Sequence, residues 1–190
     1  MQGMHPTEAL KFATLGHRVF DAVAALPVPV IAAVNGSALG GGCELTLACD
    51  LVYAHERARF GQPEVGLGLM PGFGGTQRLA RRVGPMRALE LLATGRHVKP
   101  HEACALGLCL DVFPVDELME RVLAVAERIA GQGPLAVRAS KAALQAGLDA
   151  PLPSGHAAER AAFAALFASE DAQEGTAAFL EKRAPVWRGR

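Results

Sequence analysis

Two short apolar runs, at residues 30–34 (VIAAV) and 50–54 (DLVYA), enclose a glycine-rich segment and a helix-like apolar stretch. Turn residues bound each run, as at Asn35–Gly36, so both runs are predicted to be buried strands. Between them lie Gly40–Gly42, and residues 42–49 are predicted to form a short buried helix. A strand, a glycine loop, a helix and a strand in this order indicate a parallel crossover unit and an α/β fold.

The remainder of the chain is predicted to be mostly helical, because apolar residues recur at helical spacing and many segments end in glycine or begin at proline. Residues 108–112 are expected to be an edge strand or an extended segment, and Thr7 is a candidate cap for the first helix. The chain is divided into a core portion at 1–114 and a helical C-terminal region at 115–190. The expected helices cover residues 7–26, 74–84, 85–95, 102–106, 115–131, 135–148, 154–169 and 172–182.

The composition narrows the class of protein. The 190 residues are 51% hydrophobic, which is enough for one well-filled domain, and no apolar stretch approaches the roughly 18 residues of a membrane span. Lys plus Arg and Asp plus Glu are both 19, so neither nucleic acid nor an anionic membrane is an expected partner. The six histidines lack ligand spacing, so no metal site is expected. The four cysteines show no pairing typical of a metal or disulfide framework, so reduced thiols in the cytoplasm are expected: Cys43, Cys49, Cys104 and Cys109.

The glycine-rich segments do not fit the common nucleotide-binding motifs. Leu45 stands where a dinucleotide fingerprint that starts at Gly40 needs its last glycine, and residues 72–77 (GFGGTQ) lack the lysine of a P-loop. Gly40–Gly42 instead allow a ligand to approach the backbone closely, with amide N–H groups at a helix N-terminus. This arrangement suits an oxyanion.

Two carboxylates accompany this cradle of amide groups. Glu44 lies one turn inside the apolar helix, where a desolvated carboxylate suits proton transfer, and Glu64 lies in an irregular loop between apolar residues. Together they suggest acid–base chemistry on a carbonyl compound. A structural interpretation is equally open: Glu44 caps a helix or pairs with a core arginine such as Arg78, and Glu64 is a turn residue.

Four blocks of sequence resemble the crotonase, or enoyl-CoA hydratase/isomerase, superfamily, and within it the short-chain enoyl-CoA hydratases. They are Gly40–Glu44 (GGGCE), Phe60–Glu64 (FGQPE), Pro71–Leu79 (PGFGGTQRL) and residues 174–185 (EGTAAFLEKRAP). The resemblance implies a ClpP/crotonase-type spiral of β-β-α turns, with a helical C-terminal region that forms a homotrimer or a hexamer. It also implies an acyl-CoA substrate and no separate cofactor.

The resemblance also implies roles for particular residues. The Gly41 N–H is one of two donors to the thioester oxygen, and Glu44 and Glu64 hold one water for addition to a trans-2-enoyl-CoA in fatty-acid β-oxidation. Gly72 and the helix that starts near Gly74 add dipole support to the oxyanion or are only a structural turn.

Phe163 and Lys182 match family residues that approach coenzyme A. Their assignment rests on the resemblance alone.

The chain lacks the strands and the second oxyanion-donor loop that precede this region in the family. We therefore expect an N-terminally shortened member of the family. If the sequence is complete, we also expect an exposed sheet edge that needs a partner to cover it. The resemblance leaves three functional alternatives. The first is an enoyl-CoA hydratase, which in the family uses both glutamates. The second is a non-catalytic or impaired subunit, and the third is an enoyl-CoA isomerase, which in the family typically keeps only the acid that matches Glu64.

Overall fold

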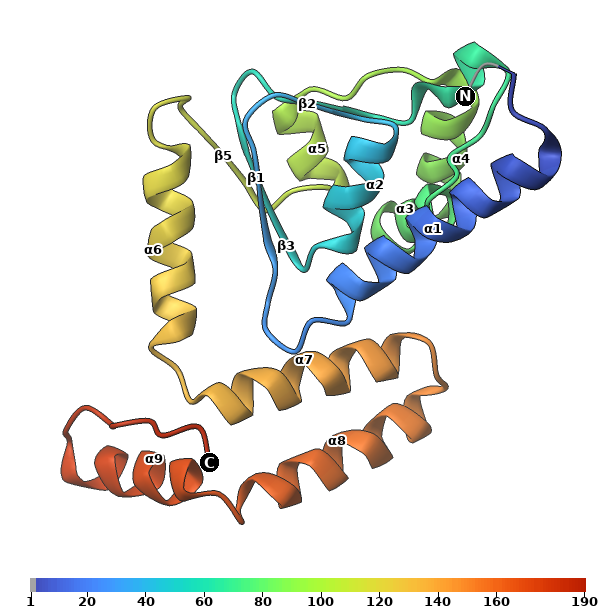
Figure 1. Cartoon of the computed structure of the whole chain (residues 1–190). Helices are drawn as coiled ribbons and strands as arrows, with labels where there is room; N and C mark the ends of the chain where they lie inside the picture. The colour runs from blue at the N-terminus through green and yellow to red at the C-terminus, as the bar shows by residue number, and fades with distance from the viewer. Residues whose placement is uncertain (1–2) are drawn as a thin grey trace. The chain divides into compact units, whose positions relative to one another are not determined.

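Two small parallel sheets carry the strands of the protein, which we describe from a computed structural model over residues 3–190 (Figure 1). The first sheet has the order β1-β3-β5, with β1 at Ile31–Val34, β3 at Leu51–His55 and β5 at Asp111–Phe113. The second sheet pairs β2 (Ser37–Leu39) with β4 (Arg59–Gly61). The two predicted buried strands are confirmed as β1 and β3, and they are parallel as the crossover pattern requires.

The predicted edge strand at 108–112 is correct in kind but begins later in the structure. The preceding helix α5 (Pro100–Leu106) closes through a left-handed Gly107, and the Leu108 N–H donates to the Ala103 carbonyl. This turn occupies the residues where the strand was expected, so that β5 starts only at Asp111.

Helix α2 (Gly41–Ala48) connects β2 of the second sheet to β3 of the first sheet. The helix was predicted to begin at residue 42, so Gly41 lies inside it rather than in the glycine loop before it. Only Gly40 remains outside as the N-cap, where φ is 53°, a value that favours glycine. The predicted buried helix is otherwise confirmed within one residue at each end.

The first helix, α1 (Pro6–Ala24), begins one step earlier than expected. Its N-cap is His5, whose N–H donates to the Glu8 carboxylate at 2.8 Å. His5 and Glu8 form a capping box, so the expectation of a Thr7 cap was wrong. In Figure 1, α1 lies alongside α2.

By its contacts, the chain forms two compact units. The first contains the described residues up to Leu26 and the segment Val30–Leu123, and the second contains Pro27–Pro29 and Ala124–Arg190. The division at 114/115 proposed from sequence stays a prediction.

The first unit contains the main hydrophobic core. The large side chains of this core that have at most 2% of their surface exposed include Phe60, Leu79, Leu91 and Val98. The remaining helical segments of this unit are η1 (Pro63–Leu67), α3 (Gly75–Val83) and α4 (Pro85–Thr94).

The second unit is helical, as predicted. Gly155 of α8 (Leu152–Leu166) lies so close to Gly147 of α7 (Pro134–Leu148) that an added Cβ would be 3.3 Å from the Gly147 Cα, so the two helices pack backbone to backbone. Its helices are the end of α6 (Leu118–Ala130), α7 (Pro134–Leu148), α8 (Leu152–Leu166) and α9 (Glu170–Glu181).

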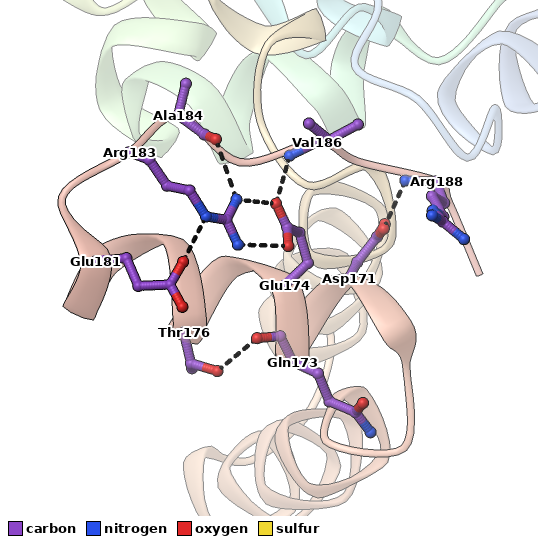
Figure 2. Close-up of polar contacts among 9 residues, drawn as sticks. All are labelled: Asp171, Gln173, Glu174, Thr176, Glu181, Arg183, Ala184, Val186 and Arg188. Carbon is purple, nitrogen blue, oxygen red and sulfur yellow. Dashed lines mark hydrogen bonds and ion pairs between the residues drawn. The ribbon is translucent and has the colours of Figure 1, made fainter.

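The C-terminal tail folds back onto α9 through a set of polar contacts (Figure 2). Arg183 binds Glu174 with two hydrogen bonds, of 2.6 and 2.9 Å. Asp171 accepts the backbone N–H groups of Arg188 and Gly189 at 2.7 and 3.0 Å. Hydrogen bonding to Arg183 lowers the pKa of Glu174 to about 2. The tail is therefore an ordered part of the second unit.

Over residues 3–190, no helix combines the length and the apolar character that crossing a membrane requires.

Candidate active site

The parallel pairing of β2 and β4 brings the two glutamate-bearing segments together. Leu39 lies opposite Gly61, and the Gly40 N–H donates to the Gly61 carbonyl at 3.0 Å. Because both strands end at the same edge, α2 with Glu44 and η1 with Glu64 leave the sheet side by side. The structure therefore places the two predicted carboxylates at one site.

Glu44 is held by the backbone of the loop that precedes α3. Its side chain is 1% exposed, and its Oε1 accepts the N–H of Phe73 at 2.7 Å and the N–H of Gly75 at 2.8 Å. An added Cβ on Gly75 would lie 3.0 Å from the Glu44 Cγ, so glycine is needed for this approach. Both bonds reach the same oxygen and fix the plane of the carboxylate.

The structural interpretation of Glu44 is correct in one part and wrong in another. The carboxylate does cap the N-terminus of α3. Its proposed pairing with Arg78 was wrong, because Arg78 instead donates to the Phe73 carbonyl and to Asp21. Capping through Oε1 is compatible with proton transfer at the other oxygen.

Glu64 lies at the start of η1 and is partly exposed. Desolvation by burial raises the pKa of its carboxyl above the ordinary value of 4.5, and the nearby charge of Glu44 raises it further. The amide of Gln62, which is 1% exposed, reaches both Glu64 oxygens at 3.1 and 3.3 Å in the orientation that satisfies its own hydrogen bonds. Glu64 thus holds its proton more strongly than a free carboxyl group does, and the buried Gln62 amide sets its direction.

Gly40 allows Glu64 to approach the start of α2. A Cβ at this position would lie 3.0 Å from the Glu64 Oε1, and the positive φ already disfavours any other residue. Gly41 is the first residue of α2, so its N–H has no acceptor within the helix. An amide group that can stabilise negative charge therefore lies beside the carboxylates.

Gly72 and the start of α3 were predicted to support the oxyanion, or to form only a structural turn. Helix α3 begins at Gly75, and the Phe73 and Gly75 amides at its start bind Glu44. A Cβ added at Gly72 would meet no atom within 4 Å, so crowding does not require glycine there. Oxyanion support from Gly72 stays a prediction.

Three residues of the site were not singled out from the sequence. Cys43 directly precedes Glu44 on α2, and burial raises the pKa of its thiol to about 11, which keeps it protonated at neutral pH. Gln62 and Phe73 contact the two carboxylates. Gln62 belongs to the FGQPE block and Phe73 to the PGFGGTQRL block, and this membership is the only sequence signal for them.

Phe163 and Lys182 belong to the second unit. Phe163 is 63% exposed and packs edge to face with Phe167 at 5.1 Å between ring centroids. Lys182 ends α9 with φ 54°, and it is the one residue other than glycine with positive φ in the part of the chain that the structure describes. Their contact with coenzyme A stays a prediction. Among residues 3–190, no three His, Cys, Asp or Glu side chains gather as a metal site would require.

Comparison with known proteins agrees with this geometry. The family model described as enoyl-CoA hydratase/isomerase matches residues 1–190. A crotonyl-CoA hydratase from Syntrophomonas wolfei is 50% identical over 183 residues, which cover 96% of this chain and 70% of that protein. A short-chain-enoyl-CoA hydratase from Clostridium acetobutylicum is 46% identical over the same shares.

Solved structures give the same result for the fold. The enoyl-CoA hydratase of Bacillus anthracis has a TM-score of 0.95 at 43% identity, covering 99% of this chain and 73% of that chain. The enoyl-CoA hydratase of Mycobacterium smegmatis has a TM-score of 0.94 at 33% identity, covering 98% and 73%. The chain therefore belongs to the enoyl-CoA hydratase/isomerase family and has the crotonase-like α/β fold.

Proposed function

We propose that this chain is an enoyl-CoA hydratase that adds water across the double bond of a trans-2-enoyl-CoA to give a 3-hydroxyacyl-CoA. The observation that carries the proposal is the meeting of two glutamates, from α2 and η1, beside the first amide of α2. Relatives named as hydratases, at 46–50% identity over nearly the whole chain, support the same reaction.

The Gly41 N–H donates to the thioester oxygen. Attack of water at the β-carbon moves electron density onto this oxygen, and a fixed N–H donor stabilises the enolate that develops. Loss of one such donor commonly costs about two to three orders of magnitude in rate.

The two carboxyl groups divide the proton transfers. Glu44 takes a proton from the water as its oxygen bonds to the β-carbon, and Glu64 gives a proton to the α-carbon. The direction of the Glu64 pKa shift, above the ordinary value, favours its assignment as the proton donor. After the product leaves, the proton on Glu44 returns to Glu64 through solvent, so that the net change is the addition of one water.

A double-bond isomerase is the second candidate. The observation that favours it is the pair of backbone N–H groups on Glu44 Oε1. If Glu44 serves only as a cap of α3, Glu64 alone would move a proton between the α- and γ-carbons.

We also propose that the protein works as a homotrimer or hexamer in the cytoplasm, with an acyl-CoA as its partner and no cofactor. The exposed aromatic rings of the second unit support an assembly through the C-terminal helices. Phe163 and Lys182 contribute to the contact with coenzyme A.

Incubation with crotonyl-CoA and with a 3-enoyl-CoA tests the proposal. Hydration of crotonyl-CoA removes the conjugated double bond and its ultraviolet absorbance. A double-bond shift without hydration would support the isomerase instead, and no change in either substrate would exclude both reactions.

A further inference from the structure

Phe73 joins the loop that binds Glu44 to helix α1. Its N–H is one of the two donors to Glu44, and its ring packs edge to face against Phe12 and Phe20 at centroid distances of 5.1 and 5.6 Å. A Cβ added at Gly16 would overlap this ring. The ring is therefore held against α1 at the one point where α1 has no side chain.

Arg78 provides a second connection to α1. Its Nη1 donates to the Phe73 carbonyl at 2.9 Å, and its Nη2 donates to the Asp21 Oδ1 at 2.5 Å. A Cβ on Gly74 would lie 2.5 Å from the Arg78 Nη1, and the φ of Gly74 is 105°. The positive φ favours glycine at this position, and the absence of a Cβ leaves room for the guanidinium beside the loop.

Phe73 is thus fixed at its ring, its carbonyl and its N–H. The first two contacts lead to α1 and the third leads to Glu44. All of these residues belong to the first compact unit. The orientation of the Glu44 carboxylate consequently depends on the position of α1.

Helix α1 contributes little to the core in return. None of its residues, all of which the structure describes, is fully buried, and the Asp21 side chain is 66% exposed. An ion pair with so exposed a partner adds little to stability. Stability of the fold therefore does not explain why Gly16 and Asp21 contact the Phe73 loop so closely.

We propose that Gly16 and Asp21 are positioning residues that set the Glu44 carboxylate for proton transfer, acting through Phe73 and Arg78. The proposal rests on the proposed hydration. A misplacement of about 1 Å in a catalytic group can cost about 100-fold in rate, so small changes in α1 would be visible in turnover.

Gly16→Ala is the main variant, because alanine favours a helix more than glycine does and loss of helix propensity cannot explain a defect. We expect kcat for crotonyl-CoA to fall about 10- to 100-fold, with KM changed less than about threefold. Gly36→Ala is the matched control, because a Cβ there meets no atom within 4 Å and Gly36 lies outside the site. It should turn over at the rate of the unmodified protein.

A double-mutant cycle separates positioning from general damage. In a Phe73→Ala background the added methyl at Gly16 has no ring to displace, so Gly16→Ala should have no further effect on kcat. Equal losses in both backgrounds would contradict the proposal. Asp21→Asn provides an independent variant if Gly16→Ala does not fold, and it should lower kcat with KM unchanged.

The amide signals of Phe73 and Gly75 give a readout that does not need activity. Glu44→Gln identifies these two signals in the ¹⁵N spectrum, because their acceptor loses its charge. Gly16→Ala should shift both, and Gly36→Ala should shift neither. Unchanged signals, or shifted signals with unchanged kcat in an active protein, would overturn the proposal. If the unmodified protein does not hydrate crotonyl-CoA, the proposed function fails, and the amide signals alone decide whether α1 orients Glu44.

Discussion

Glu44 and Phe73 are joined by a 2.7 Å hydrogen bond from the Phe73 N–H to the Glu44 Oε1. The bond links a carboxylate on α2 to the loop before α3, and it leaves that carboxylate in one orientation beside Glu64. Glu44 therefore has both a structural role and a proposed catalytic role. Substitutions of Glu44 and of Glu64 should consequently differ in their effects on stability and on activity.

Glu64→Gln should lower the hydration rate by about two to four orders of magnitude, because the amide forms hydrogen bonds but transfers no proton. Crotonyl-CoA turnover measures the loss. Circular dichroism should show an intact fold, and near-normal turnover would remove Glu64 from the mechanism.

The same variant should also gain stability at neutral pH. The pKa of Glu64 is raised in the folded protein, so its contribution is full below the unfolded pKa of about 4.5 and is lost as the pH rises through the folded value. Gln cannot ionise and avoids this loss. Thermal unfolding should therefore give Glu64→Gln a higher Tm than the unmodified protein at pH 7, with a smaller difference below pH 4. A lower Tm at pH 7 would show that the buried environment favours the charged form.

Two substitutions of Glu44 separate its capping from its chemistry. Glu44→Gln retains an oxygen for Phe73 and Gly75 and should lose hydration with little change in stability. Glu44→Ala leaves two buried N–H groups without an acceptor and should cost about 3 kcal/mol of unfolding free energy in a denaturant titration. Glu159→Ala, at an exposed position of α8, is the control, because it removes no acceptor from these amides. Retention of a double-bond shift in Glu44→Gln would favour the isomerase.

The contact between Glu174 and Arg183 predicts a pH dependence in the second unit. The pKa of Glu174 is about 2, so its stabilising effect is present above the unfolded pKa of about 4.5 and disappears as the pH falls toward 2. Glu174→Gln should lower the Tm at pH 7, and the difference should vanish by about pH 2. Glu159→Gln, at an exposed position of α8, is the matched control and should have no effect at either pH.

Light scattering tests the proposed assembly. Phe167, Phe179 and Leu180 are 61%, 83% and 80% exposed in the single chain, and surface of this kind commonly marks an interface. We expect a trimer or a hexamer of the 19.8 kDa chain. Phe167→Asp should shift the mass toward the monomer, whereas Met86→Asp, on α4, should not. A monomer in the unmodified protein would contradict the assembly.

The sequence predicts most of the regular elements because their patterns are long or strongly apolar. It misses β2 and β4, because Ser37–Leu39 and Arg59–Gly61 are three residues each and have no apolar run. These two strands are nevertheless the ones that bring Glu44 and Glu64 together. The sequence therefore predicted which carboxylates belong to the site, but it did not predict the strand pairing that brings them together.

The partners of Glu44 were also beyond reach of the sequence. Spacing offers Arg78 as a counter-ion, but backbone amides satisfy the carboxylate, and a backbone N–H has no signature in the sequence. Arg78 instead reaches Asp21, which is 57 residues away along the chain. A contact of this range follows from the packing of α1 and not from any local pattern.

Hydration of crotonyl-CoA in water enriched in oxygen-18 is the clearest measurement of the proposed reaction. Mass spectrometry of the product should show 3-hydroxybutyryl-CoA with one solvent oxygen at the β-carbon, and both Glu44→Gln and Glu64→Gln should lose it. A product with a shifted double bond and no solvent oxygen, or labelled product at the normal rate from either variant, would contradict a hydratase that uses both glutamates.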